Sequence, residues 1–293
     1  MLPVLIALVL GAAQVRRVTV APAETLLVTA RGEGTPVVMV PGLFGSSYGW
    51  RNVVSRLEEA GRLAIVIEPL AIGGSSRPGG ADYSLTAQAD RIAAVLDTLR
   101  IRGAVVVAHS TSAGMVMRLA VRRPDLVRAV VSLDGGPTEA AATPGFRRAM
   151  SMAPLIRLLG ANRLRGRIRA SLVASSGDVS WVTDEAIVRY TEGATEDLGA
   201  TLRAFMAMAE SREAMALAPR LVELRCPVFL LVGDVPHAGR VSDREVELLR
   251  SRVPAFTIDL VPGAGHYLQE ERPDIVAAVV ERALATASTV AGR

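Results

Sequence analysis

Residues 104–114 read AVVVAHSTSAG, a purely apolar run that ends in two serines, a threonine and a histidine. A serine hydroxyl becomes an effective nucleophile only when a base removes its proton and an acid orients that base. A serine on a sharp turn between a strand and a helix projects its oxygen over the sheet. The same turn aims backbone N–H groups at a developing oxyanion. The stretch therefore predicts a serine nucleophile at the end of a buried strand.

Ser110 and Ser112 both have small residues two positions away on each side, as such a tight turn requires. The flanking residues are Ala108 and Ser112 for the first, and Ser110 and Gly114 for the second. Position favours Ser110, because the strand is expected to end at Ala108 and Ser112 would already lie inside the helix. The alternative is a serine that caps the helix and does no chemistry.

The chain has three histidines, and His266 is the best placed to act as the base. It lies in the glycine-rich loop PGAGH after an expected strand, which lets an imidazole reach the centre of the sheet edge. His109 would point away from the neighbouring serine hydroxyl, and His237 lies in an expected flexible loop. We expect a structural or supporting role for both. No HExxH or similar pair occurs, so no metal site is expected.

Short β-branched runs alternate with longer amphipathic stretches, the pattern of a mostly parallel sheet covered by helices. Strands are predicted at 15–21, 25–30, 35–42, 63–69, 104–108, 127–134, 226–234 and 256–262. Helices are predicted near 50–60, 84–101, 112–122 and 242–251, and from 273 onward. In open α/β sheets ligands bind beyond the carboxyl ends of the strands, and the chemically unusual residues of this chain follow those ends.

Length and composition indicate one globular domain that carries an insertion. Of the 293 residues half are hydrophobic, and residues 15–134 and 226–293 form the predicted core. Residues 135–225 have helical periodicity with little strand character, which predicts a helical cap over the site.

Charge and cysteine content exclude several classes of protein. The net charge is +4, and every basic residue is an arginine. Because only 4% of the residues are aromatic, we expect no nucleic-acid partner. The single cysteine, Cys226, excludes a disulfide framework and any cysteine-based metal cluster.

The N-terminal residues 1–14, MLPVLIALVLGAAQ, form a separate apolar segment. The run is too short to span a bilayer, so no stable membrane span is expected. It fits a signal-peptide core that ends in small residues, although the usual positive charge is missing. Export is favoured over a cytoplasmic location, and both stay open, as does the oligomeric state.

Four segments together resemble the α/β-hydrolase family, in its capped, esterase-like form, over about residues 15–285. They read PGLFGSSYGW, EPLAIGGSSRPGGADYSL, AHSTSAG and VPGAGHYLQEERPDIV, in the family's order and at suitable intervals. The resemblance implies an α/β fold with a mostly parallel, doubly wound sheet and an inserted helical cap. It also implies that Ser110 is the nucleophile, that His266 is the general base, and that the Leu43 and Thr111 N–H groups form an oxyanion hole.

The acid of the triad is where the sequence departs from that family. Most members carry it as G-x-x-D after the penultimate strand, but here GDVP places Pro236 in that position. Asp234 is two residues early, and Asp243 is expected to cap a helix. The family's other placement is the end of the strand that follows the nucleophile helix, where Asp134 stands. We prefer Asp134, with Asp234 as the alternative.

A second departure is Pro41, which replaces the histidine of the family's oxyanion loop. A proline side chain cannot make that histidine's hydrogen bonds, but the hole itself consists of backbone N–H groups further along. The loop is therefore expected to remain competent.

The resemblance implies a cofactor-free serine hydrolase that cleaves esters, or related lactones and thioesters, through an acyl-enzyme. A cap rich in Leu, Met, Ala and Phe implies a small-molecule substrate with an apolar group. Carbon–carbon bond hydrolysis or cofactor-free haloperoxidase chemistry could use the same triad. From a different class, a non-catalytic protein that binds a small ligand is the remaining alternative.

Overall fold

The computed structural model describes residues 13–141, 147–148 and 165–290. Most of the predicted N-terminal segment 1–14 therefore lies outside the described residues. Within them, no helix combines the length and the apolar character needed to cross a membrane.

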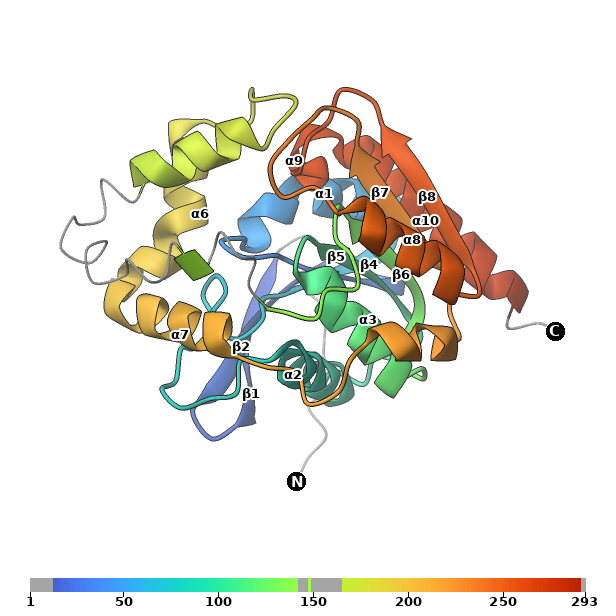
Figure 1. Cartoon of the computed structure of the whole chain (residues 1–293), viewed down its shortest axis with the longest axis horizontal. Coiled ribbons are helices and arrows are strands. Elements are labelled where there is room, and N and C mark those ends of the chain that lie inside the picture. The colour runs from blue at the N-terminus through green and yellow to red at the C-terminus, as the bar shows by residue number, and fades with distance from the viewer. Residues whose placement is uncertain (1–12, 142–146, 149–164, 291–293) are drawn as a thin grey trace.

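An eight-stranded sheet forms the centre of the molecule, in the order β1-β2-β4-β3-β5-β6-β7-β8 (Figure 1). The first two strands run antiparallel to their neighbours, and the remaining strand pairs are parallel. The α/β, mostly parallel architecture expected from the sequence is thus confirmed. The strands are β1 (Gln14–Ala21), β2 (Glu24–Arg31), β3 (Thr35–Val40), β4 (Arg62–Ile67), β5 (Ala104–His109), β6 (Val127–Leu133), β7 (Val228–Gly233) and β8 (Phe256–Val261).

Helices cover both faces of this sheet. One face packs against α1 (Arg51–Glu59) and α10 (Pro273–Val290), and the other against α2 (Leu85–Thr98), α3 (Ser112–Arg122) and α8 (Asp243–Arg252). The remaining described elements are α6 (Asp184–Glu196), α7 (Leu198–Glu210), α9 (Leu268–Glu271) and two short 3-10 helices, η1 (Ser47–Trp50) and η2 (Ala218–Glu223).

The two helical layers are separated by the alternation of side chains along each central strand. In β5, Val106 faces the cluster under α2 and α3, whereas Val105 and Val107 face the cluster under α1 and α10. All six residues of β5 are buried. A strand buried on both faces reads as a continuous apolar run, which is why the sequence marked it so clearly.

Most predicted elements lie where the sequence placed them, within one to three residues at each end. The strand predicted to start at Cys226 begins at Val228, because Pro227 has no backbone N–H to give to the sheet. The predicted cap residue Asp243 is instead the first residue of α8. Ser242 caps that helix and forms a capping box with Glu245.

In the insertion between β6 and β7, helices α6 and α7 stand to one side of the sheet in Figure 1, opposite α8 and α10. A buried arginine ties its two ends to the core. Arg118 of α3 pairs with Glu139, near the start of the insertion, at 2.7 Å and with Glu213, near its end, at 3.3 Å. The chain therefore leaves and rejoins the core close to α3.

The packing of β7 gives a direct test of the core. Leu230 is fully buried, so Leu230→Ala should reduce the free energy of unfolding by about 2–5 kcal/mol. Leu260 on the neighbouring strand is 61% exposed, and Leu260→Ala should change it by less than about 0.5 kcal/mol. Urea unfolding of both variants measures the difference, and equal losses would contradict the described faces of the sheet.

Candidate active site

Ser110 occupies the turn between β5 and α3 in a left-handed backbone conformation, with φ at 55°. A serine rarely adopts this conformation, and the close approach of neighbouring backbone holds it there. The Ser110 N–H donates to Leu133 O at 2.9 Å. A Cβ atom at Gly135 would lie 2.2 Å from Ser110 O, so only glycine fits at that position.

The two candidate serines lie in different environments. Ser112 is fully buried, and its hydroxyl donates to Pro41 O at 2.7 Å. The hydroxyl of Ser110 is partly exposed and makes no hydrogen bond with another described residue, His266 included. Such bonds are often formed only when substrate is bound. Of the two hydroxyls, that of Ser110 is the one left available.

Asp134 directly follows β6, also in the left-handed region, and its carboxylate reaches His266. Asp134 Oδ2 lies 2.7 Å from His266 Nδ1, and Oδ1 accepts from the Val241 N–H at 3.1 Å. Burial by itself would raise the pKa of Asp134. The hydrogen bond and charge of His266, with the Val241 N–H and His237, outweigh it and hold the pKa below its usual value.

Asp234, the other candidate acid, lies elsewhere. Its side chain is exposed and accepts from the Gly263 N–H at 2.7 Å. It therefore holds the start of the loop that carries His266, and Asp134 is the carboxylate that the structure brings to the imidazole.

The loop that carries His266 is fixed from two sides. Its backbone N–H donates to Ser175 O of the insertion at 2.7 Å, and its carbonyl oxygen lies 2.9 Å from His109 Nε2. Because His266 Nδ1 faces Asp134, the other ring nitrogen, Nε2, remains for a hydroxyl proton.

His109 supports this loop as an uncharged ring. Its side chain is buried, with its ring centroid 4.7 Å from that of His266. Burial lowers the pKa of His109 to about 3, and the charge of His266 adds to the effect. Since a carbonyl oxygen only accepts, the hydrogen of neutral His109 sits on Nε2 and is donated to His266 O.

His237 is placed differently from what its flexible-loop position suggested. Its side chain is completely buried, and its Nε2 lies 2.5 Å from the same Asp134 Oδ2 that contacts His266. Its Nδ1 lies 2.6 Å from Val235 O. The reason is that the loop folds back over the ends of β6 and β7, which local sequence does not reveal.

Asp134, His237 and His266 offer three potential metal ligand atoms within 4.8 Å of one another. Ligands around a tetrahedral zinc ion, each about 2.0–2.1 Å from it, are more than 3 Å apart. The 2.5 and 2.7 Å contacts on Asp134 are instead those of hydrogen bonds. The cluster is arranged to hold protons.

The loop after β3 lies against the turn at Ser110. A Cβ at Gly42 would lie 2.9 Å from His109 O and 3.2 Å from Ser110 Cβ, so glycine permits this approach. Neither the Leu43 N–H nor the Thr111 N–H is engaged by a hydrogen bond among the described residues. Glu68 fixes the far end of the loop, because its carboxylate accepts from the Ser47 N–H at 2.6 Å.

Aromatic side chains connect the insertion to both loops of the site. Phe44, after β3, packs edge-to-face on Phe205 of α7, with ring centroids 5.3 Å apart. Tyr267, next to His266, packs on Trp181 of the insertion with centroids 5.1 Å apart. The insertion therefore presents apolar rings to the site.

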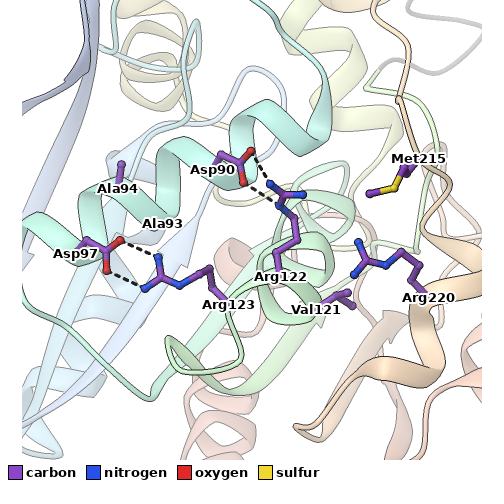
Figure 2. A pocket seen from close by; sticks show the side chains of 9 residues that line it. All are labelled: Asp90, Ala93, Ala94, Asp97, Val121, Arg122, Arg123, Met215 and Arg220. Atoms are coloured by element: carbon purple, nitrogen blue, oxygen red, sulfur yellow. Dashed lines mark hydrogen bonds and ion pairs between the residues drawn. The ribbon is translucent and has the colours of Figure 1, made fainter.

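A surface hollow of about 690 Å³ lies between α2 and α3, well away from these residues (Figure 2). It lies at the C-terminal end of α3, about 15 Å along the helix from Ser110. Two ion pairs, Asp90–Arg122 and Asp97–Arg123, engage the charged groups of α2 and α3 in its wall. The remaining charged residue of the wall, Arg220, pairs with Glu223. A second hollow of about 780 Å³ lies beside η1 and α6. Neither hollow is lined by Ser110 or His266.

Comparison with known proteins agrees with the fold. A family profile described as the alpha/beta hydrolase fold matches residues 35–170. A thermophilic esterase from Thermogutta terrifontis superposes with a TM-score of 0.74 at 21% identity, over 94% of this chain and 99% of that one. A bromoperoxidase from Bacillus anthracis superposes with a TM-score of 0.78 at 19% identity, over 93% and 100% of the two chains. The chain has the α/β-hydrolase fold.

Sequence comparison points the same way. The chain is 26% identical over 256 residues to the 2-(acetamidomethylene)succinate hydrolase of Mesorhizobium japonicum. The aligned region covers 86% of this chain and 88% of that protein. The family and its relatives support a hydrolase as the general class of activity.

Two buried carboxylates of this α/β-hydrolase were not singled out by sequence. Glu271 accepts hydrogen bonds from the Gly177, Asp178 and Gly265 N–H groups at 2.8–2.9 Å, and from the Tyr267 N–H at 3.1 Å. Glu68 anchors the loop after β3. In the sequence each is simply an acidic residue next to a loop. Many exposed acidic residues have the same neighbours, so the sequence does not mark these two as buried.

The depressed pKa of His109 predicts a pH-dependent loss of stability. The unfolded chain takes up this proton near pH 6.5 and the folded chain near pH 3. Between these values only the unfolded state binds it, so stability is complete above pH 6.5 and falls as the pH drops. From pH 7 to pH 5 His109 should cost roughly 2 kcal/mol, which His109→Gln should abolish. Urea unfolding at both values measures this, and parallel curves for the two proteins would contradict it.

Proposed function

We propose that this protein is a serine hydrolase that cleaves carboxylic esters, or related lactones and thioesters, through an acyl-enzyme. The observation that carries the proposal is the 2.7 Å contact of Asp134 with His266, at the edge of the sheet where the Ser110 turn presents a free hydroxyl. In this role Ser110 is the nucleophile, His266 the general base, and Asp134 the acid.

Acylation follows from the arrangement of the three side chains. Ser110 Oγ attacks the carbonyl carbon of the substrate while His266 Nε2 accepts its proton. Asp134 stabilises the imidazolium that forms. The tetrahedral oxyanion is bound by the Leu43 and Thr111 N–H groups, and collapse of this intermediate expels the alcohol, which receives the proton from His266.

Deacylation uses the same groups in reverse. His266 removes a proton from water, the resulting hydroxide attacks the acyl-enzyme, and Ser110 leaves with the proton returned. Pro41 does not interfere, because its carbonyl oxygen is occupied by Ser112 and the hole uses N–H groups further along. No step requires a cofactor.

The insertion is proposed to act as a cap that binds the apolar part of the substrate. Phe205 packs on Phe44 of the oxyanion loop, and Trp181 packs on Tyr267 beside His266. Aromatic rings beside the site favour an apolar acyl or alcohol group over a charged one. Carbon–carbon bond hydrolysis and haloperoxidase chemistry remain alternatives on the same triad.

An active-site probe tests the nucleophile. A fluorophosphonate should label the wild-type protein covalently, and Ser110→Ala should abolish labelling because the attacking oxygen is gone. Ser112→Ala, which removes a hydroxyl bonded to Pro41 O, should still be labelled. Peptide mapping by mass spectrometry locates the adduct. An unlabelled wild-type protein would instead favour a non-catalytic ligand-binding protein.

The two aspartates provide a test of the acid. Asp134→Asn should lower kcat on an aryl ester by roughly 10²–10⁴-fold, because an amide neither selects the productive tautomer of His266 nor stabilises its charge. Asp234→Asn retains an oxygen for the Gly263 N–H and should stay within a few-fold of wild type. Comparable modest losses in the two variants would exclude Asp134 as the acid.

A further inference from the structure

The ring of His237 lies between two hydrogen-bond acceptors. Nδ1 is 2.6 Å from Val235 O, and Nε2 is 2.5 Å from Asp134 Oδ2. A carbonyl oxygen only accepts, so Nδ1 must carry a hydrogen. At 2.5 Å a second hydrogen must lie between Nε2 and the carboxylate oxygen, because two lone pairs would repel. His237 and Asp134 therefore share two hydrogens, and the pair is electrically neutral.

Two placements of the second hydrogen satisfy this count. Either His237 is an imidazolium facing a carboxylate, or it is neutral and faces a protonated Asp134. The first placement suits the other contacts of Asp134 better, because an ionised carboxylate is the stronger acceptor for the Val241 N–H and for His266. The lowered pKa of Asp134 agrees with the ionised carboxylate.

We propose that His237 is a positively charged positioning residue, which holds Asp134 and reduces the negative charge that Asp134 presents to His266. The proposal rests on the function proposed above, in which Asp134 and His266 are the acid and base. His237 itself does not touch the reacting atoms. It acts through the carboxylate that it shares with His266.

The consequence concerns the proton affinity of His266. The ring centroids of His237 and His266 are 5.8 Å apart, so a positive charge on the first disfavours a proton on the second. His266 must be unprotonated to accept the hydrogen of Ser110. A charged His237 therefore keeps the base ready at lower pH than Asp134 alone would allow.

Few other charges face the His237 ring among the described residues. Asp134 approaches from the end of β6 and His266 from the loop after β8. On its own loop, Asp234 is turned to the Gly263 N–H, and Arg240 is exposed to solvent. At the start of α8, Glu245 is engaged with Ser242.

Histidine-ring NMR of the wild-type protein tests the charge directly and requires no activity. The chain has three histidines, so ¹⁵N-histidine labelling gives three rings to assign. His109→Gln removes one set of signals, and reaction with a fluorophosphonate shifts that of His266. At pH 7.5 both nitrogens of His237 should show bound hydrogens. A His237 ring with one bare nitrogen would overturn the proposal.

The pH dependence of kcat/KM on an aryl ester tests the consequence. His237→Gln keeps an N–H for Asp134 and removes the charge, so the midpoint of the acid limb should move up by about one pH unit. His109→Gln is the matched control. It removes a ring that lies even nearer to His266, with centroids 4.7 Å apart, but an uncharged one, and should leave the midpoint within about 0.2 pH units of wild type.

The outcomes separate the proposal from the proposed function. An unchanged midpoint in an active, folded His237→Gln protein would refute the role of His237, whatever its kcat. A wild-type protein that neither reacts with the probe nor cleaves esters would refute the hydrolase instead. In that case the NMR measurement still decides the charge of His237, and it also decides it if His237→Gln does not fold.

Discussion

The buried carboxylate of Asp134 is the group on which the arrangement of the site depends. A charge that is removed from water is costly unless it is surrounded by donors, and Asp134 has three: the rings of His237 and His266 and the Val241 N–H. These come from two different loops. The carboxylate therefore requires the loops after β7 and β8 to converge at the end of β6.

The turn at Ser110 depends on backbone packing rather than on charge. Ser110 keeps a left-handed conformation because its carbonyl oxygen and Cβ are enclosed at close range by Gly135 and Gly42. The buried Ser112 hydroxyl donates to Pro41 O and so joins the start of α3 to the end of β3. Small residues on three separate segments thus pack around one turn and hold Ser110 in its strained conformation.

The insertion is hydrogen-bonded to the loop that carries His266. Ser175 accepts from the His266 N–H, and Glu271 joins the Gly177 and Asp178 N–H groups to that of Gly265 on the histidine loop. A displacement of this part of the insertion would therefore pull on the loop that carries His266. The position of His266 is therefore coupled to this part of the insertion through shared hydrogen bonds.

The sequence by itself determined the strands, the helices, and the turn at Ser110, because these follow from local periodicity and from the spacing of small residues. It also indicated His266, through a glycine-rich loop after a strand. It did not decide whether Asp134 or Asp234 lies beside His266, since both follow strands that end at the same edge of the sheet. Only the tertiary structure decided that Asp134 reaches His266, and that His237 is buried on the same oxygen. Those contacts join residues more than a hundred positions apart, and their geometry depends on how the loops fold over the sheet, which no local pattern encodes.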